Sequence, residues 1–317
     1  MQALRAHERG GPERFVVEEA PEPAPGPGEV QVAVTAAAIT FDELLWDLSW
    51  TTTDGAPRTP VIPSHEFSGV VSAVGPGAGP DSPGGLAVGD VVYGMVPFDR
   101  DGAAAEIVVA PLDAVAVRPR TLDAVSAAAL PLAGLTAIQG LVDVARLQPG
   151  ERVLVLGGAG GVGSMAVQIA KRLGGHVTAT VRGSDAAAAV LTLGADTAVD
   201  ITTGQTPSSA PFDVILDTVG GAALDGAWSL LQVGGRLVTL QAPPDPERAR
   251  AAGVTASFFV VEPSRGKLVD LAALVDSGAL TVPVAATFAL EKGREAFESG
   301  RRPGRRPGKT VLEVRPE

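Results

Sequence analysis

The sequence predicts an α/β protein with two domains, one a small antiparallel barrel or sandwich and the other a doubly wound parallel sheet. Three observations lead to this prediction. In the first 120 residues, short β-rich runs are joined by turns of Gly and Pro, and Val30, Val32 and Val34 alternate as in a half-buried strand. From residue 122, helical stretches alternate with short apolar runs, which indicates a parallel sheet covered on both faces. One of those runs ends in a Gly-rich turn, GGAGGVGS at 157–164.

One helix is expected inside the first domain, in TFDELLWDL at 40–48. Thr40 and Glu43 have the spacing of a capping box, in which each side chain bonds a free backbone amide at the start of a helix. Four apolar residues then share one helix face: Phe41, Leu44, Leu45 and Leu48. Trp46 points away from this stripe, which directs it toward a cleft.

The last segments predict a discontinuous first domain. TFALEKGREAFESG and KTVLEV have the patterns of a helix and a strand that return to the barrel. We therefore expect a catalytic domain of residues 1–121 and 285–317, with a dinucleotide-binding domain of residues 122–284 inserted.

The composition excludes several classes of function. The formal net charge is −11, whereas nucleic-acid binding needs a basic surface, so no nucleic-acid partner is expected. No apolar run approaches the ~18 residues of a membrane helix, and the first residues lack the apolar core of a secretion signal. We therefore expect no membrane partner and a cytoplasmic location. Because the chain has no cysteine, disulfides, thiolate catalysis and thiolate metal ligands are excluded.

The Gly-rich turn predicts dinucleotide binding. Gly158, Gly160 and Gly163 have the G-x-G-x-x-G spacing, between an apolar strand and a helix that opens near Ser164. Gly158 permits the tight turn, Gly160 lets the backbone approach a pyrophosphate, and Gly163 lets helix pack on strand. Free amides of the helix start face the phosphates. The binding turn is completed by Ala159, Gly161 and Val162. The alternative is a turn needed only for packing.

The residues after the second strand of this domain favour NADPH over NADH. An NAD site usually offers an acid about 20 residues on for the ribose 2′-hydroxyl, but no acid stands between Gly163 and Asp185. The stretch HVTATVRGS instead ends with Thr180, Arg182 and Ser184, whose guanidinium and hydroxyls suit a 2′-phosphate. The alternative for Arg182 is an ordinary surface arginine.

Over essentially its whole length the chain resembles the medium-chain dehydrogenase/reductase superfamily, in its zinc-independent quinone oxidoreductase (zeta-crystallin-like) type. The resemblance lies in several stretches in the family's order: VIPSHEFSGVVSAVG, VGDVVYGM, AAALPLAGLTA, AGGVGSMAVQIAK, DTVGG, GGRLVTL and GKTVLEV. It implies a GroES-like β-barrel domain, a Rossmann domain and an active site in the cleft between them.

The resemblance also bears on metal binding. Zinc-binding members take ligands from an early Cys, from the His of a Gly-His-Glu stretch, and from a second Cys or an acid. Here Thr40 stands in the early Cys position, and His65 with Glu66 supplies too few ligands for a catalytic zinc, which needs three. We expect no metal, and His65 is expected beside the substrate pocket.

Further cofactor-binding residues follow from the resemblance alone, with packing at strand ends as the alternative for each. They are Thr136, Asp217, Thr218, Val219, Leu240, Gln241, Phe259 and Val260.

The catalytic segment departs from the family. Several quinone reductases have an Asn and one or two tyrosines where this chain reads AITFDELLWDLSWTTTDG, with Thr40 in the Asn position. Thr40 and Tyr93, the chain's one tyrosine, are the candidate proton donors, although a helix cap and a barrel core residue are the alternatives. Trp46, Trp50 and Phe258 are expected to line the substrate pocket.

The expected function is reduction of a quinone or an α,β-unsaturated carbonyl by NADPH without a metal, because a conjugated acceptor needs no strong Lewis acid. One alternative is a specialised enoyl reductase of a biosynthetic, polyketide-like pathway. Another is a catalytically silent cofactor-binding protein. The resemblance further implies a homodimer through the strand at VTASFFVV, and a small-molecule substrate as the other partner.

Overall fold

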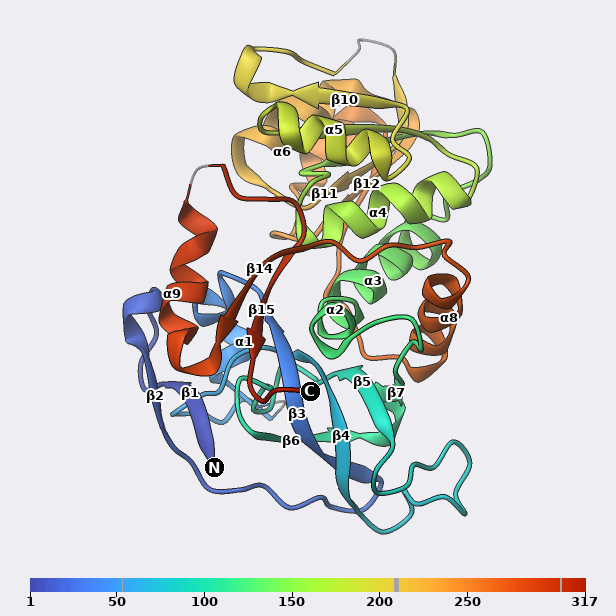
Figure 1. Ribbon diagram of the computed structural model, residues 1–317. Helices are drawn as coiled ribbons and strands as arrows, with labels where there is room; N and C mark the ends of the chain where they lie inside the picture. Colours follow the sequence, from blue (N-terminus) through green and yellow to red (C-terminus); the bar gives the residue numbers. More distant parts are fainter. Residues whose placement is uncertain (53, 208–210, 303) are drawn as a thin grey trace. The chain divides into compact units, whose positions relative to one another are not determined.

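The computed structural model describes residues 1–52, 54–207, 211–302 and 304–317. The chain divides into two compact units (Figure 1). The barrel unit comprises Met1–Leu132, Glu262–Arg305 and Lys309–Glu317, and the Rossmann unit comprises Ala133–Val261 and Arg306–Gly308. The fold class predicted from the sequence is confirmed: a GroES-like barrel domain is combined with a Rossmann domain built on a parallel sheet.

The barrel unit is built around one sheet, in the order β14-β15-β3-β4-β5-β7, with β6 also paired to β3. The long strand β3 is buried on both faces at its carboxyl end. Ala36 and Ala38 pack against helix α2 (Ala124–Ala128), while Ala37 packs in the core on the other face. Small side chains allow that double packing. The bounds are β3 Glu29–Ile39, β4 Glu66–Val74, β5 Val91–Met95, β6 Ile107–Pro111, β7 Val115–Val117, β14 Val284–Ala289 and β15 Lys309–Glu313.

The late segments return to the barrel unit, as the sequence predicted. Helix α9 (Gly293–Glu298) packs on the hairpin of β1 (Gln2–Ala6) and β2 (Phe15–Glu19), where the rings of Phe15 and Phe297 are 4.3 Å apart. β15 pairs with β3.

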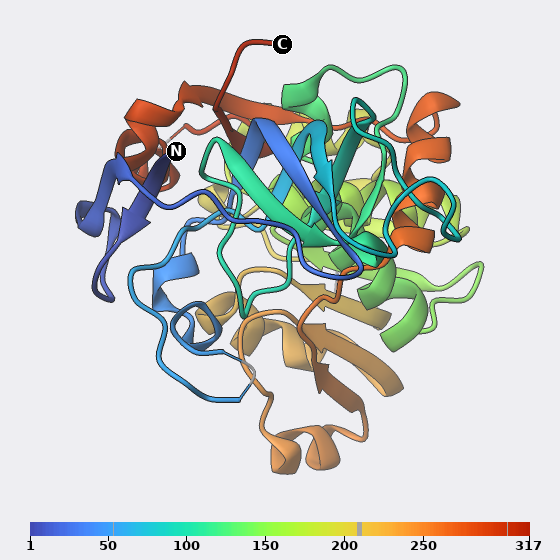
Figure 2. The same ribbon diagram turned by 90° about the horizontal axis from the view of Figure 1, so that it is seen from below.

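The observed unit boundaries differ from the predicted ones. Helix α8 (Arg265–Asp276) belongs to the barrel unit, and it lies against β7 (Figure 2). Its Asp276 carboxylate accepts hydrogen bonds from the amide and hydroxyl of Thr121, and its Arg265 guanidinium donates to the Leu112 carbonyl. The barrel unit therefore extends to residue 132 and resumes at 262, rather than ending at 121 and resuming at 285.

The helix predicted at 40–48 does not form. A 3-10 turn, Glu43–Leu45, is followed by the short helix α1, Asp47–Trp50. Half of the capping box is present, because the Glu43 carboxylate accepts a hydrogen bond from the Thr40 amide at 2.8 Å. The other half is missing, because the Thr40 hydroxyl accepts from Lys309 instead of bonding a backbone amide of the turn. The apolar stripe is also wrong, since two of its members are exposed: Leu45 at 57% and Leu48 at 42%. This stretch is held by its Glu43 anchor rather than by one apolar face.

The Rossmann unit contains six parallel strands in the order β10-β9-β8-β11-β12-β13. All these strands are parallel, but the order in which the chain adds them changes side between β8 and β11. Open α/β sheets bind ligands at the carboxyl ends of the strands at such a switch point. α4 packs on β8 and β9, α5 on β9 and β10, and α7 on β13. The bounds are β8 Arg152–Leu156, β9 His176–Val181, β10 Thr197–Asp200, β11 Phe212–Asp217, β12 Leu231–Thr239, β13 Thr255–Phe258, α3 Pro131–Ile138, α4 Gly161–Arg172, α5 Ser184–Thr192, α6 Gly221–Ala227 and α7 Pro246–Ala252.

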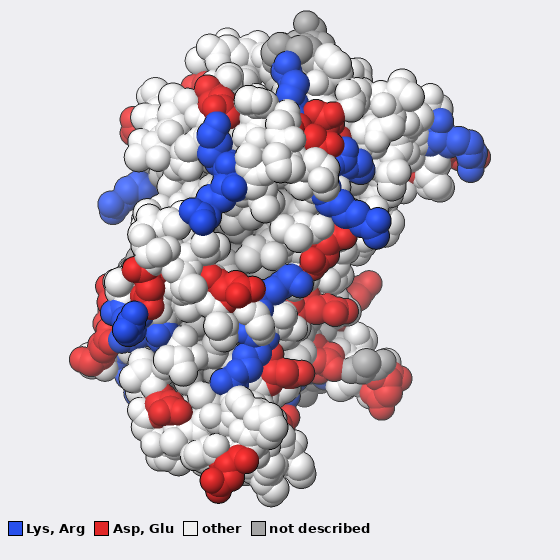
Figure 3. Space-filling view, turned by 90° about the vertical axis from the view of Figure 1, so that its right-hand side faces the viewer, with Lys and Arg blue, Asp and Glu red and all other residues white. Residues whose placement is uncertain are grey.

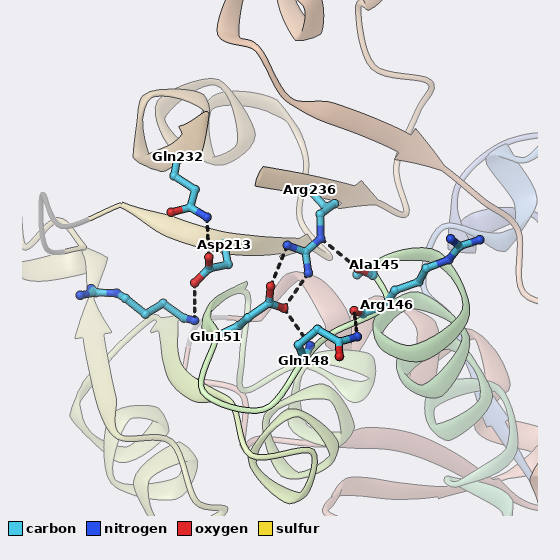
Figure 4. Close-up of polar contacts among 8 residues, drawn as sticks. Ala145, Arg146, Gln148, Glu151, Asp213, Gln232 and Arg236 are labelled. Carbon is cyan, nitrogen blue, oxygen red and sulfur yellow. Dashed lines mark hydrogen bonds and ion pairs between the residues drawn. The ribbon is translucent and has the colours of Figure 1, made fainter. Parts of the chain in front are cut away.

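A polar cluster ties the opposite, amino-terminal edge of this sheet together (Figure 4). The Arg236 guanidinium donates to both oxygens of Glu151, at 3.0 and 2.6 Å, and to the Ala145 carbonyl. Although burial opposes it, these bonds from Arg236 lower the pKa of Glu151. The two-bond geometry fixes β12 to the loop before β8, beside a hollow of about 490 Å³.

Within the described residues, none of the helices is both long enough and apolar enough to cross a bilayer.

Candidate active site

The Gly-rich turn follows β8 at the switch point of the Rossmann sheet. The left-handed residue is Gly157, with φ 79°, so it makes the tight turn that was predicted for Gly158. Gly158 instead allows close packing, since a Cβ there would lie 2.6 Å from Cβ of Ala179. A Cβ on Gly163 would lie 2.1 Å from the Gly157 carbonyl oxygen, so only glycine permits helix α4 to meet the turn.

The start of helix α4 is free to receive an anion. The helix begins at Gly161 with Gly160 as its N-cap, and no side chain caps it. Ala159, Gly160 and Val162 are all only half-buried. Free amides and the helix dipole at such an end favour phosphate groups, so this turn fits a dinucleotide pyrophosphate. The Ala159 carbonyl accepts a hydrogen bond at 3.0 Å from the amide of Gly308, in the returning segment of this unit.

The end of β9 differs in part from the sequence prediction. Arg182 and Ser184 are exposed and available to a ligand. Thr180 is buried, and its hydroxyl accepts from the Gly157 amide at 3.0 Å, so it supports the phosphate turn instead of facing a 2′-phosphate.

An acid that the sequence reading missed reaches this same loop. Strand β10 ends in Asp200, whose carboxylate accepts from the Gly183 amide at 2.9 Å and from the amide and hydroxyl of Thr202. These bonds, that of Gly183 first, lower the pKa of Asp200. Asp200 lies beyond the stretch from Gly163 to Asp185 in which an NAD site usually has its acid, and it ends the short strand β10, which the sequence pattern does not predict.

The loops after β11 and β12 complete the same sheet edge. The Asp217 carboxylate is fully buried and accepts from the amides of Val219 and Gly220 and from the Thr239 hydroxyl. The Thr218 hydroxyl donates to the Leu156 carbonyl at 2.7 Å. These side chains shape the loop and do not project from it. The residues with exposed surface here are Val219 and Gln241, with Leu240 half-buried.

The remaining predicted cofactor residues are spread through the Rossmann unit. Thr136 is buried on α3. The Phe259 ring lies against Gly140. Phe258, at the end of β13, and Val260 are 37% and 41% exposed.

The barrel unit contains a buried cluster of charged side chains. The Lys309 ammonium lies 2.6 Å from Oε1 of Glu66, and the two side chains are 8% and 1% exposed. Oε2 of Glu66 accepts from the Leu132 amide at 2.9 Å. Lys309 also donates to Oγ1 of Thr40 at 3.2 Å. Thr40, at the end of β3, is half-buried.

A second buried carboxylate, Glu43, adjoins this cluster. It accepts from the amides of Thr40 and Ser64, the latter at 2.6 Å. Burial raises the pKa of Glu43 to about 7, despite those two bonds and the nearby Lys309 charge. Ser64 itself has φ 70°, a left-handed conformation that costs a non-glycine residue about 1 kcal/mol.

His65 is buried at 2% exposure, next to Ser64. Its Nδ1 donates to the Pro97 carbonyl at 3.2 Å, because a carbonyl can only accept, and its ring centroid lies 4.9 Å from that of Phe98. Burial, followed by the charge of Arg58, lowers the pKa of His65 to about 4. The ring is therefore neutral at physiological pH.

These residues do not fit a catalytic zinc. Glu66 is engaged by Lys309 and the Leu132 amide, and the bond from Nδ1 of His65 to the Pro97 carbonyl leaves Nε2 as the ring atom that could bind a metal. Throughout the described part of the chain, no group of three His, Cys, Asp or Glu side chains could hold a metal ion. Zinc needs at least three such ligands.

The other candidate pocket residues have different surroundings. Tyr93 is wrong as a proton donor: it is fully buried, its hydroxyl donates to the Leu268 carbonyl at 2.5 Å, and burial raises its pKa. Trp50 donates its indole N–H to the Leu44 carbonyl and packs on the barrel core. Trp46 is half-buried, edge-on to Phe98 at 5.5 Å.

The comparisons with known proteins agree with this geometry. A family model described as an alcohol dehydrogenase GroES-like domain matches residues 26–120, and one described as a zinc-binding dehydrogenase matches residues 193–312. A probable zinc-binding oxidoreductase, mitochondrial, of Arthroderma benhamiae is 30% identical over 311 residues, covering 93% of this chain and 91% of that protein. The chain belongs to the medium-chain dehydrogenase/reductase superfamily. Within it, the chain is of the quinone oxidoreductase-like type.

Other relatives of this medium-chain reductase match over part of their own length. The NAD(P)H oxidoreductase RTN4IP1, mitochondrial, of Bos taurus is 36% identical over 260 residues, 71% of this chain and 65% of that protein, so the chain spans about two thirds of it. The spectinabilin polyketide synthase system protein NorB of Streptomyces orinoci is 33% identical over 300 residues, 90% of this chain and 13% of that protein.

Solved structures of the superfamily share the fold. The quinone oxidoreductase from Coxiella burnetii has a TM-score of 0.84 at 26% identity over 99% of both chains. Mycobacterial Rv1454c complexed with NADPH has a TM-score of 0.85 at 28% identity, over 99% of this chain and 100% of that one. The homologues that match this chain thus include NAD(P)H and quinone oxidoreductases, and one similar structure is complexed with NADPH.

Neutral, buried His65 predicts a pH dependence of stability. The unfolded chain binds a proton at His65 below about pH 6.5, whereas the folded state binds it only near pH 4, so the free energy of unfolding falls as pH falls through that window. In His65→Asn this fall is absent. The stability of wild type relative to the variant should therefore drop by about 3 kcal/mol between pH 7 and pH 4.

Urea unfolding at pH 4, 5, 6 and 7 measures this difference. Glu43 acts in the opposite sense, because its raised pKa makes stability fall as pH rises toward 7, but it does so in both proteins and cancels. His176→Asn, at an exposed position, should keep the wild-type fall. A pH-independent difference for His65→Asn would contradict the neutral histidine.

Proposed function

We propose that this protein is an NADPH-dependent reductase that delivers hydride to a quinone or an α,β-unsaturated carbonyl without a catalytic metal. The observation that carries the proposal is that, among the described residues, no group of three His, Cys, Asp or Glu side chains could hold a metal ion, and the Glu66 carboxylate, next to His65 in the sequence, is already bonded to Lys309 and to the Leu132 amide.

Conjugated acceptors suit such a site. Hydride reaches a carbon remote from the oxygen, and the negative charge spreads over an enolate or a quinol, so hydrogen bonds suffice where a simple ketone would need a strong Lewis acid. The nicotinamide cofactor supplies the hydride, and the turn at residues 157–163 with the start of α4 would hold its pyrophosphate.

NADPH is the proposed cofactor because Arg182 and Ser184 present a guanidinium and a hydroxyl at the exposed end of β9. Asp200 lies at the same loop, and its Oδ1 already accepts three hydrogen bonds within the protein. The NADPH complex of the similar mycobacterial structure supports the same choice.

A second candidate is a specialised enoyl reductase of polyketide-like biosynthesis. The observation in its favour is the 33% identity to the polyketide synthase system protein over 90% of this chain. Trp46 would then form part of a wall for a larger acceptor.

The proposed partners are a small-molecule acceptor and a second copy of the chain. β13 is an edge strand whose Phe258 and neighbouring Val260 are exposed, and pairing with another copy would cover that edge. On the face shown in Figure 3, Lys and Arg side chains are interspersed with Asp and Glu, which supports the absence of a nucleic-acid partner.

Turnover tests the function directly. Purified protein should oxidise NADPH in the presence of 1,4-naphthoquinone or 2-cyclohexen-1-one, with kcat unchanged by a chelator such as EDTA. Loss of activity in EDTA that zinc restores, or stoichiometric zinc in the protein, would overturn metal independence. Turnover of one complex enone alone, with simple quinones inert, would favour the biosynthetic enoyl reductase.

Arg182→Ala tests the cofactor assignment. Because a charge-assisted bond to the 2′-phosphate is lost, the KM for NADPH should rise about ten- to a hundredfold while the KM for NADH changes little. Arg172→Ala, at the exposed end of α4, is the matched control and should change neither. Equal effects of Arg182→Ala on the two cofactors would contradict the assignment.

Gel filtration with light scattering tests the dimer. Wild type should elute with twice the mass of one chain, and Phe258→Asp should shift it toward one chain mass, because a charge would enter the proposed interface. A wild-type protein of single-chain mass at micromolar concentration would rule the dimer out.

A further inference from the structure

We propose that Thr40 and Lys309 together form the electrophilic group of this reductase. In this proposal the Thr40 hydroxyl donates a hydrogen bond to the acceptor's carbonyl oxygen, and the Lys309 ammonium behind it stabilises the negative charge that develops there. The inference rests on the proposed function and assigns the residues that replace a metal's role in it.

The positive charge of Lys309 is held in one shielded position. Lys309 is 8% exposed, so its ammonium is largely shielded from water, and its charge is balanced by Glu66 at 2.6 Å. The Leu132 amide holds the other oxygen of Glu66, which keeps the carboxylate, and therefore the ammonium, in one position. A fixed cation in a poorly solvated site acts more strongly on a nearby developing charge than the same cation in water.

The hydrogen bond between Lys309 and Thr40 has a fixed direction. Lys309 carries only donor hydrogens, so Oγ1 of Thr40 is the acceptor of their 3.2 Å contact. The hydroxyl proton of Thr40 is thereby left for another acceptor, and no hydrogen bond among the described residues uses it. The hydroxyl does not cap the following turn, because Glu43 fills that role through the Thr40 amide. A half-buried hydroxyl polarised by a cation is a strong donor toward a ligand.

Hydride is added to the β-carbon of the enone, and the C=C electron pair moves through the α-carbon to the carbonyl oxygen. The enolate oxygen accepts the Thr40 hydrogen bond, while Oγ1 of Thr40 accepts from Lys309. The α-carbon then takes one proton from water and the ketone is restored. NADPH is the reductant, and both protein groups end in their starting protonation states.

The test compares Thr40→Val, Lys309→Met and the double variant in full-length protein, with NADPH and 2-cyclohexen-1-one. Each single variant should lower kcat by about a hundredfold, the loss typical of one donor to a developing oxyanion, with the Kd for NADPH unchanged. Because the two residues act as one unit, the kcat of the double variant should be no lower than the kcat of the less active single variant. Thr40→Ser and Lys309→Arg, which keep the hydroxyl and the cation, should recover most of the activity.

Matched controls are Thr287→Val and Lys292→Met, both at exposed positions of the barrel unit, which should keep wild-type kcat. If Lys309→Met fails to fold, Thr40→Val against Thr40→Ser decides, because that pair leaves the Lys309–Glu66 contact intact. The proposal is overturned if Thr40→Val keeps kcat within about threefold of wild type, or if the losses in the two single variants multiply in the double one. A wild type that binds NADPH but reduces no acceptor would overturn the proposed function and this inference with it.

Discussion

Much of the barrel unit depends on the two bonds that the buried carboxylate of Glu66 makes. One oxygen binds Lys309 and the other accepts from the Leu132 amide. Leu132 is the last residue before the chain enters the Rossmann unit, and Lys309 is the first after its final return. Removing either partner of a buried ion pair typically costs about 3 to 5 kcal/mol, because the remaining charge is left unpaired. The same group therefore holds two chain segments of the barrel unit and the only buried lysine among the described residues in place.

Around that carboxylate, the chain holds several groups in costly states. Glu43 is fully buried with its pKa raised to about 7, and His65 is buried and neutral. Ser64, which precedes His65 and donates its amide to Glu43, has a left-handed backbone conformation. Such costs gather where surrounding structure over-determines the geometry, which is typical of functional sites. The positive charge of this region is that of the Lys309 side chain, so the protein itself supplies it.

Local patterns predicted most of the fold, and contacts between distant residues account for what they missed. Strands such as β3 and β8 were found from apolar runs, and the Gly-rich turn from its spacing. The stretch at 40–48 misled because its apolar spacing is helical, while its conformation is set by Glu43 binding the Ser64 amide. Asp200 was missed because it reaches the β9 loop from the next strand over. The contact of Lys309 with Thr40 joins residues 269 positions apart, which no local pattern can reveal.

The hydrogen bond from Gly308 to Ala159 has a consequence for synthesis of the protein on the ribosome. All six strands of the Rossmann sheet precede residue 262, yet the phosphate turn gains this bond only after residue 308 has emerged. A nascent chain can therefore form the sheet early and still have an incompletely supported turn.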